Sequence, residues 1–160
     1  MEAMALDLVQ AASTAELAGI RELFLEYAAF LGVSLHFQDF EGEVERLPGK
    51  YAPPGGSLLL AREGEVAAGC GAFRPLEGDI CEMKRMYVRP AFRGQGLGRR
   101  LARQLIAEAV AAGYASMRLD TIPAKLPQAS TLYASLGFVE IPAYYDNPIP
   151  GVAYFEFQLR

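Results

Sequence analysis

The part of this sequence best suited to ligand chemistry is the glycine-rich segment Arg93-Gly94-Gln95-Gly96-Leu97-Gly98. Glycine lets the backbone turn sharply and approach a ligand closely, because no Cβ stands in the way. A helix is predicted to begin at Gly96, and the first N–H groups of a helix are unpaired and carry a partial positive charge. The loop and the helix start together predict a cradle for an anion such as a pyrophosphate.

Positive charge gathers on the same segment. Five arginines and no acidic residue lie from Arg89 to Arg103, in a chain whose net charge is −4. Arginine suits phosphate oxygens because its planar guanidinium donates several hydrogen bonds. Arginines on an exposed helix face are usually only solvated, so these charges support an anion site without identifying it.

The spacing of the glycines separates this loop from two other phosphate-binding loops. A P-loop needs Gly-Lys followed by Ser or Thr, and the sequence has no such tripeptide. A dinucleotide-binding loop needs G-x-G-x-x-G and an acidic residue about twenty positions later. Here the glycines occupy every second position, at Gly94, Gly96 and Gly98. A nucleotide-binding interaction domain is therefore disfavoured.

Two motifs together resemble the GNAT superfamily of N-acetyltransferases. Arg93-x-x-Gly96-x-Gly98, directly after Met86-Tyr87-Val88-Arg89-Pro90, is similar to the acetyl-CoA signature of that superfamily. The heptapeptide Leu132-Tyr133-Ala134-Ser135-Leu136-Gly137-Phe138 is similar to its late helix and the strand that follows. A predicted helix and strand separate the two motifs, as in the superfamily. The resemblance covers at least residues 58–138.

The resemblance implies acetyl-CoA as cosubstrate and assigns its binding residues. Backbone N–H groups of the loop would bind the pyrophosphate, while the glycines shape the turn. The preceding strand would pair through its backbone with the pantetheine arm, as though the arm were an added strand. The cofactor-binding residues implied in this way are Met86, Val88, Arg93, Gly94, Gln95, Gly96, Leu97, Gly98 and Arg99.

The implied reaction is direct acyl transfer to an amine. A neutral amine attacks the thioester carbonyl and a thiolate leaves, so the amine must lose a proton and the sulfur benefits from a proton donor. Tyr133 occupies the position of the superfamily's proton-donating tyrosine. A phenol with a pKa near ~10 is protonated at pH 7 and can donate to a thiolate. The alternative is that Tyr133 only packs beside Leu132 and Leu136.

Glu82 is the candidate proton acceptor. It lies on the strand that leads to the loop, on the same face as Met86 unless a bulge intervenes. Members of the superfamily often carry a glutamate on this strand, which acts through water. A partly desolvated carboxylate there would have a raised pKa. An ion pair with Lys84 or Arg85 is an equal alternative, since structural pairs also perturb pKa values.

One position departs from the superfamily pattern. Many members carry an asparagine seven residues before the tyrosine, where it contacts the cofactor arm, and this sequence has Leu126 there. That one contact cannot be made by Leu126, and Gln128 or Ser130 could supply it instead.

The acceptor is expected to be a primary amine, with a small metabolite favoured over a protein. In the superfamily the acceptor pocket is built from the first two helices and the last hairpin. An acidic rim there would suit a cationic amine, although acids on an exposed helix usually form a solvated face. An amino acid, an antibiotic and a protein terminus stay open as acceptors. These regions contain Tyr27, His36, Phe37, Asp39, Glu41, Glu43, Glu45, Tyr144, Tyr145, Asp146 and Asn147.

Three further polar residues have structural alternatives. His36, the only histidine, is expected in a structural or acceptor-pocket role. Asp120 and Thr121 end a predicted strand, where they would cap the turn before Pro123 rather than touch the acceptor. No cluster of His, Cys and Asp has the spacing of metal ligands, so no metal is expected.

A catalytically silent acyl-CoA-binding sensor on the same fold is the competing function. Binding needs only the loop 93–98, whereas turnover also needs Tyr133 and a proton acceptor. The presence of both kinds of residue favours an enzyme.

Hydrophobic periodicity predicts the elements that position these residues. Strands first form a meander and later alternate with helices, an order typical of a mixed sheet. Together with the resemblance, this predicts an α/β (α+β mixed) fold whose central, mostly antiparallel sheet has helices on both faces. The predicted strands span 6–10, 57–61, 66–73, 80–88, 117–122, 138–141 and 153–159, and the predicted helices span 14–31, about 38–47, 96–112 and 129–136.

Two details of the strands bear on the site. Gly69 and Gly71 inside the strand 66–73 indicate a bulge or close packing. Simple alternation along 80–88 predicts two faces. One face would carry Met83, Arg85 and Tyr87, and the other Glu82, Lys84, Met86 and Val88.

Length and composition fit a single N-acetyltransferase domain over residues 1–160. The net charge of −4 argues against nonspecific nucleic-acid binding. Cys70 and Cys81 form no CxxC pair and are expected as buried, reduced thiols. No signal peptide or membrane-spanning apolar run is seen, so a cytoplasmic protein without a membrane partner is expected. Homodimers are the commonest oligomers, so a homodimer is the state to test.

Overall fold

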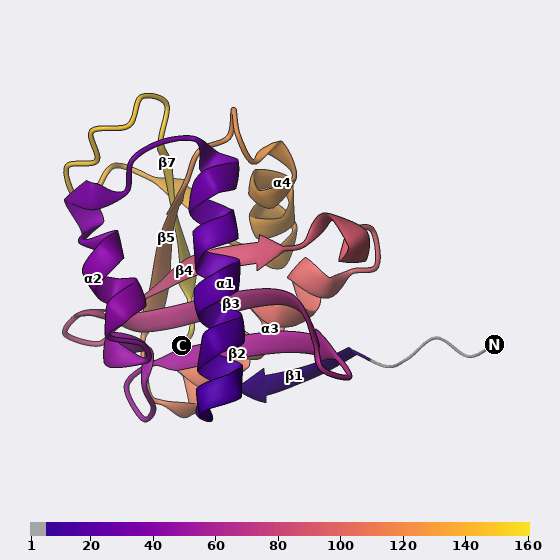
Figure 1. The fold of residues 1–160 in the computed structure, drawn as a ribbon. Coiled ribbons are helices and arrows are strands. Elements are labelled where there is room, and N and C mark those ends of the chain that lie inside the picture. The colour runs from indigo at the N-terminus through magenta and orange to yellow at the C-terminus, as the bar shows by residue number, and fades with distance from the viewer. Residues whose placement is uncertain (1–5) are drawn as a thin grey trace.

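The computed structural model describes residues 6–160, which build one seven-stranded sheet with helices on both faces (Figure 1). The strand order is β1-β2-β3-β4-β5-β7-β6. Every neighbouring pair is antiparallel except β4 and β5, which run parallel. This arrangement confirms the predicted fold class. The strands are β1 Leu6–Gln10, β2 Ser57–Glu63, β3 Val66–Glu77, β4 Ile80–Val88, β5 Ser116–Thr121, β6 Val139–Ile141 and β7 Ala153–Gln158.

Local sequence signals set the ends of the first helix, α1 (Thr14–Leu31). The Ser13 hydroxyl accepts a hydrogen bond from the Glu16 N–H, and the Glu16 carboxylate accepts one from the Ser13 N–H in return. This capping box satisfies two otherwise free donors. Gly32 ends the helix with a φ of 66°, a conformation that glycine adopts without steric penalty.

Three further α-helices and three short 3-10 helices complete the described residues. The second helix is shorter than predicted, because Asp39 has a φ of 54° and breaks the helical path before Phe40. The α-helices are α2 Phe40–Glu45, α3 Leu97–Ala111 and α4 Pro127–Leu136, and the 3-10 helices are η1 His36–Gln38, η2 Gly49–Tyr51 and η3 Pro90–Phe92. Within residues 6–160, no helix combines the length and apolar character that crossing a membrane would require.

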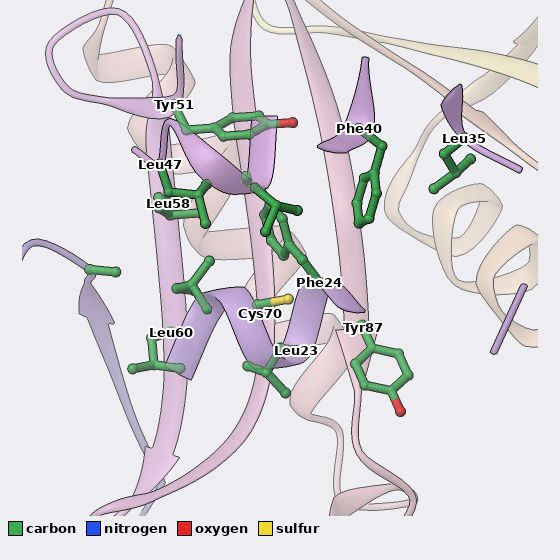
Figure 2. Packing of buried hydrophobic residues seen from close by; sticks show 14 of the residues in the cluster. Leu23, Phe24, Leu35, Phe40, Leu47, Tyr51, Leu58, Leu60, Cys70 and Tyr87 are labelled. Carbon is green, nitrogen blue, oxygen red and sulfur yellow. The ribbon is translucent and has the colours of Figure 1, made fainter. Parts of the chain in front are cut away.

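Each face of the sheet has its own hydrophobic cluster. On one face Leu23 and Phe24 of α1 pack over β2 and β3, as Figure 2 shows. On the other face Leu101 and Leu105 of α3 are completely buried against the strands. Fully burying one such side chain contributes about 1.5–3 kcal/mol. The two clusters therefore hold the sheet rigidly between its helices. Cys70 and Cys81 are free and buried, as predicted.

A β-bulge in β4 decides which side chains point to which face. Ala72 pairs with Lys84 and Cys70 pairs with Tyr87, so two steps along β3 correspond to three steps along β4. Arg85 lies in the bulge with a φ of 61°, which is unusual for a residue other than glycine. A bulge of this kind re-aims the side chains that follow it. The indication of a bulge or close packing from Gly69 and Gly71 is thereby confirmed.

The bulge makes the predicted two-face assignment of β4 wrong. Met83 packs in the α3-side cluster, but Tyr87 packs in the α1-side cluster. Met86 and Val88 likewise pack on the α3 side. Glu82 and Lys84 alternate with Met83 and therefore point to the α1 side. The extra residue shifts the period-two pattern by one, so Glu82 does not share a face with Met86.

The parallel strands β4 and β5 pair only along part of their length. Their register runs from Ile80 opposite Ser116 to Glu82 opposite Arg118 and then stops. Beyond that point β4 pairs only with β3, and β5 pairs only with β7. Figure 1 shows the two strands diverging. The sheet is therefore split at its centre, with one edge of β4 open from Lys84 to Val88.

Candidate active site

The open edge of β4 offers backbone groups to an extended ligand. The Arg89 N–H donates to Ala68 O at 2.9 Å, toward β3. Because successive residues of a strand direct their backbone groups to opposite edges, Val88 directs its own N–H and C=O toward the opening. The Val88 carbonyl accepts a hydrogen bond of 2.9 Å from Nε of Arg93. The edge thus presents polar backbone groups that no neighbouring strand uses.

The glycine loop lies at the end of this edge and leads into α3. Gly94 and Gly96 have φ values of 81° and 76°, and an added Cβ at either would meet nothing within 4 Å. Among the described residues, the N–H groups of residues 94–99 have no backbone acceptor, and no side chain caps the helix. These orphan donors at a helix N-terminus are what a phosphate group requires.

The arginines near the loop have different surroundings. Arg89 is held by the Glu26 carboxylate of α1 and by Ala67 O, so its charge is neutralised locally. Arg93 packs over the Phe30 ring at 5.2 Å. Arg99 donates to Ser135 Oγ at 2.9 Å and sits beside the first turn of α3. Arg93 and Arg99 therefore keep their positive charge close to the loop, whereas the charge of Arg89 is offset by Glu26.

Tyr133 is fixed by α4 in an aromatic environment. Its side chain is 6% exposed and packs against Phe138 and Phe155, with ring centroids 5.6 and 6.5 Å away. Burial raises the pKa of Tyr133, and the nearby Tyr27 and Asp120 add to the rise. The phenol therefore keeps its proton at neutral pH and has an O–H to donate.

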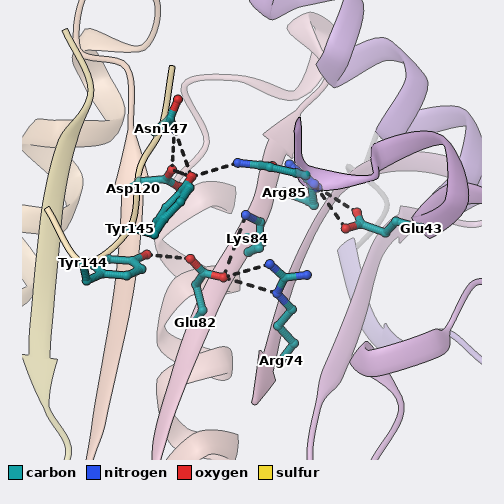
Figure 3. Close-up of polar contacts among 10 residues, drawn as sticks. Glu43, Arg74, Glu82, Lys84, Arg85, Asp120, Tyr144, Tyr145 and Asn147 are labelled. Carbon is teal, nitrogen blue, oxygen red and sulfur yellow. Dashed lines mark hydrogen bonds and ion pairs between the residues drawn. The ribbon is translucent and has the colours of Figure 1, made fainter. Parts of the chain in front are cut away.

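Glu82 is surrounded by hydrogen-bonding partners (Figure 3). One carboxylate oxygen accepts from Nε and Nη2 of Arg74, both at 3.2 Å, and the other accepts from the Tyr144 hydroxyl at 2.6 Å. The Lys84 ammonium lies 3.9 Å away. The side chain is only 2% exposed. Of the two ion pairs considered from the sequence, the Lys84 pair is present.

Arg85 does not pair with Glu82. Its guanidinium makes two hydrogen bonds to the Glu43 carboxylate, at 2.8 and 3.1 Å, and lies 5.0 Å from the centre of the Phe40 ring. The bulge is the reason, because it turns Arg85 toward α2 instead of along the strand.

A small cavity of about 40 Å³ lies on the α1 side of the split sheet. Three charged residues line it from the two strands that diverge: Lys84 and Arg85 from β4, and Asp120 from β5. Its remaining wall comes mainly from α1 and the loop after β6. The lining residues are Tyr27, Leu31, Leu35, Gln38, Lys84, Arg85, Asp120, Thr121, Ile122, Leu126, Asn147, Ile149 and Val152.

Asp120 is bound to the loop after β6 and does not cap a turn. One of its carboxylate oxygens accepts hydrogen bonds from the Tyr145 hydroxyl and from Nδ2 of Asn147. The turn-capping interpretation of Asp120 is therefore wrong. The Thr121 hydroxyl is buried and has no hydrogen-bond partner among the described residues.

Other predicted acceptor residues lie outside the cavity. The His36 side chain is 85% exposed and makes only a 3.5 Å contact with Glu41. Asp39 pairs with Arg46, and Glu43 pairs with Arg85. The acidic rim is thus largely solvated or neutralised. Among the side chains proposed from the sequence, Tyr27 and Asn147 do line the cavity.

The position of the missing asparagine is apolar in the structure as well. Leu126 packs against the α1-side cluster and lines the cavity. Gln128 is exposed, whereas the Ser130 hydroxyl is buried without a hydrogen-bond partner in residues 6–160. Of the two substitutes considered, Ser130 therefore has the free polar group.

Sequence reasoning missed that Lys84 and Asp120 face the same cavity. The available signal was the presence of Glu82, Lys84 and Arg85 in a strand of otherwise apolar residues, because charged side chains are rarely buried without a specific reason. Within residues 6–160, no group of three or more His, Cys, Asp or Glu side chains is arranged to hold a metal ion.

Known proteins of one family have sequences similar to this chain. Residues 17–138 match the profile described as the Acetyltransferase (GNAT) family. An uncharacterized N-acetyltransferase of Schizosaccharomyces pombe is 42% identical over 146 residues, covering 90% of this chain and 89% of that protein. An N-acetylaspartate synthetase of Xenopus tropicalis is 32% identical over 113 residues, covering 67% of this chain and 41% of that protein.

Solved structures agree in fold. A GNAT-family acetyltransferase of Staphylococcus aureus superposes with a TM-score of 0.81 at 19% identity, covering 98% of this chain and all of that one. An acetyltransferase of Salmonella typhimurium, solved with its cofactor acetyl-CoA, has a TM-score of 0.66 at 24% identity and covers 98% and 95%. The split sheet, the glycine loop and these similarities lead to one conclusion: the chain belongs to the GNAT family of N-acetyltransferases.

Proposed function

We propose that this N-acetyltransferase uses acetyl-CoA to acetylate a primary amine of a small acceptor, with Tyr133 as the proton donor. The observation that carries the proposal is the continuity of two binding features. The open edge of β4 ends at Val88, and the orphan N–H groups of residues 94–99 follow directly. One long ligand with an extended arm and a pyrophosphate would use both.

The residues present fit acetyl-CoA. An extended arm can add to an open strand edge through backbone hydrogen bonds, which require no particular side chain. Met86 and Val88 supply that edge, while Gly94 and Gly96 hold the loop so that its N–H groups converge. Arg93 and Arg99 are the cations closest to those groups in sequence. When bound, acetyl-CoA supplies the acetyl group as a thioester.

Tyr133 has the protonation state that its proposed role requires. Its raised pKa keeps the hydroxyl protonated at neutral pH, so an O–H is available beside the leaving thiolate. The rings of Phe138 and Phe155 restrict the phenol to one orientation. Water is largely excluded by the same packing, which strengthens a hydrogen bond to a developing negative charge.

Glu82 remains the proposed proton acceptor for the attacking amine. It lies on β4, the strand that borders the opening, and since it does not line the cavity itself, a proton from the amine would reach it through water. Its hydrogen bonds with Arg74 and Tyr144 hold the carboxylate in a fixed position. The alternative is that Glu82 serves only as an ion-pair partner of Arg74 and Lys84. A Glu82 variant distinguishes this structural role from proton transfer.

The size of the cavity supports a small acceptor. A volume of about 40 Å³ corresponds to roughly three water molecules, since one water needs about 10–15 Å³ by this measure. A protein side chain with its flanking backbone needs a wider groove. The name of the N-acetylaspartate synthetase relative also points to a small amine, aspartate, as the acetylated molecule in that protein.

A catalytically silent acyl-CoA sensor is the second candidate, because the loop and the strand edge alone would bind the ligand. The buried, oriented Tyr133 favours the enzyme, since a sensor has no need of a proton donor there.

Thermal unfolding with and without acetyl-CoA tests the proposal, with NAD and ATP as controls. A ligand at 100 times its Kd stabilises the folded state by about 2.7 kcal/mol, which raises the Tm by several degrees. A shift with acetyl-CoA alone, followed by thiol release when amines are added, supports the enzyme. A shift without thiol release from any amine supports the sensor. No shift at saturating acetyl-CoA would refute the cofactor assignment.

A further inference from the structure

The Lys84 side chain is nearly buried, and its ammonium group makes no hydrogen bond within residues 6–160. Its side chain is 3% exposed, and its nearest acid, Glu82, is 3.9 Å away, beyond hydrogen-bonding distance. Among residues 6–160, no acceptor within 3.5 Å takes any of its three protons. Burying a charge in this way is unfavourable unless something in the cavity accepts those protons. Lys84 lines the cavity, so the acceptor of its hydrogen bonds would lie there.

Asp120 faces the same cavity with the opposite charge. One of its oxygens is occupied by Tyr145 and Asn147, which fix the carboxylate in place. The second oxygen accepts no hydrogen bond from residues 6–160. A carboxylate held rigidly with one free oxygen is suited to receive an ammonium or amine group.

The other charges around the cavity cancel in pairs. Arg85 is neutralised by two hydrogen bonds from its guanidinium to Glu43. Glu82 is neutralised by Arg74. The cavity therefore offers a ligand one net positive group, Lys84, and one net negative group. A diamine would meet repulsion at Lys84, and a simple amine would leave Lys84 unsatisfied.

The remaining wall is apolar and limits the size of the ligand. Leu31 and Leu35 come from the first helix and the segment after it, and Ile149 and Val152 come from the loop before β7. The volume of about 40 Å³ has room for a compact polar head group. Apolar walls beside two opposite charges suit a molecule whose charged groups are close together and whose remaining atoms are few or apolar.

We propose that the acceptor is a free α-amino acid, whose carboxylate binds Lys84 and whose amine is received by Asp120. This inference rests on the proposed acetyl-CoA-dependent activity and specifies its substrate class. The two recognition groups come from β4 and β5, so an amino acid would bridge the strands at the point where they diverge. Its amine would then lie beside the opening in which the acyl donor is proposed to bind.

The test compares amino acids with their amides. Acetyl transfer from acetyl-CoA is followed by thiol release with the free proteinogenic L-amino acids, with the corresponding α-amides, and with putrescine. The amide keeps the amine and the side chain but lacks the carboxylate. We expect at least one amino acid to have a kcat/KM at least about 10-fold higher than its amide, because a charge-assisted hydrogen bond to a buried group is strong.

Two variants assign the recognition to individual residues. Lys84→Met should raise the KM for the preferred amino acid by about 10- to 100-fold and change the KM for the amide far less, which abolishes the preference. Asp120→Asn should raise the KM for the amino acid and the amide alike, because both carry the amine. Lys50→Met, at an exposed lysine on η2, is the matched control. A merely structural role of Lys84 would change both substrates equally.

The stabilisation of each variant by acetyl-CoA is measured in parallel. Unaltered stabilisation in Lys84→Met shows that the variant is folded and binds the donor. If the wild-type protein binds acetyl-CoA but acetylates amides or putrescine as well as amino acids, the inference is overturned and the proposed function stands. If it binds acetyl-CoA and acetylates no amino acid, the inference is likewise overturned. If it neither binds acetyl-CoA nor transfers acetyl, the proposed function itself fails.

Discussion

Gly71 of β3 leaves room for the side chain of Met86 in the bulge of β4. A Cβ built at Gly71 would lie 2.4 Å from the Met86 sulfur and 3.0 Å from Cδ1 of Leu105. The glycine therefore allows the bulge, and the bulge in turn directs Met86 and Val88 to the α3 side of the sheet and Tyr87 to the α1 side. A residue with no side chain thus helps to set the orientation of the strand segment that leads to the glycine loop.

Substitution of Gly71 should destabilise the protein and disturb the site. Gly71→Val forces Met86 and Leu105 apart, and overpacking of this kind costs about 1–3 kcal/mol. Urea unfolding measures the decrease in the free energy of unfolding. The matched control is Gly19→Ala in α1, where an added Cβ meets only ordinary contacts of 3.8 Å or more and should be neutral or stabilising. Equal stability of Gly71→Val and the wild-type protein would contradict this account of the bulge.

Removal of the Tyr133 hydroxyl should lower turnover and spare binding. Tyr133→Phe keeps the aromatic packing, so the free energy of unfolding and the shift of Tm by acetyl-CoA should change little. The kcat should fall by about 10²-fold, the lower range for loss of a general acid. Tyr114→Phe, which loses a hydrogen bond to Gly55 O between the loops that precede β5 and β2, is the control. An unchanged kcat in Tyr133→Phe would show that another group protonates the thiolate.

Glu82→Gln distinguishes a proton acceptor from an ion-pair partner. As a proton acceptor, Glu82 is needed in turnover, and the variant should lose about 10²-fold in kcat. Loss of its charge also leaves Arg74 and Lys84 without their partner, which should lower stability. Glu156→Gln breaks a comparable carboxylate–guanidinium contact to Arg118, of 2.7 Å, and controls for that effect. If both variants lose stability and neither loses kcat, Glu82 is structural only.

Buried Lys84 should make the protein more stable as the pH rises from about 8. Burial, with repulsion from Arg85, lowers the pKa of Lys84 to about 8, against roughly 10.4 in an unfolded chain. Between these values the unfolded chain holds a proton that the folded protein has released, so raising the pH favours the folded state. The gain by pH 9.5 should be about 1–2 kcal/mol.

Urea unfolding of the wild-type protein and Lys84→Met at pH 7.0 to 9.5 measures this gain as the difference between the two proteins. Lys50→Met should follow the wild-type curve. Equal pH slopes for the wild-type protein and Lys84→Met would show that Lys84 keeps its proton through this range. Measurement stops at pH 9.5 because unfolded tyrosines begin to ionise near pH 10, whereas burial raises the pKa of Tyr27 to about 12.

Local signals in the sequence predicted the parts of the site that are contiguous along the chain. Gly94 and Gly96 have positive φ values, which glycine adopts readily, and the apolar residues after them recur with helical spacing. A turn followed directly by a helix was therefore predictable from this segment alone. The single domain over residues 1–160 and the homodimer stay predictions.

Tertiary structure alone decided how the charged residues meet. Period-two alternation predicted that Glu82 and Met86 share a face, and one extra residue at Arg85 reverses that result, since a bulge depends on the partner strand as much as on the bulged one. Lys84 and Asp120 are 36 positions apart and face one cavity only because β4 and β5 run parallel and then diverge. The sequence by itself determined the glycine loop and the helix that follows it, because short-range backbone preferences fix them. The placement of Lys84 and Asp120 at one cavity was decided by long-range strand pairing, which no local pattern encodes.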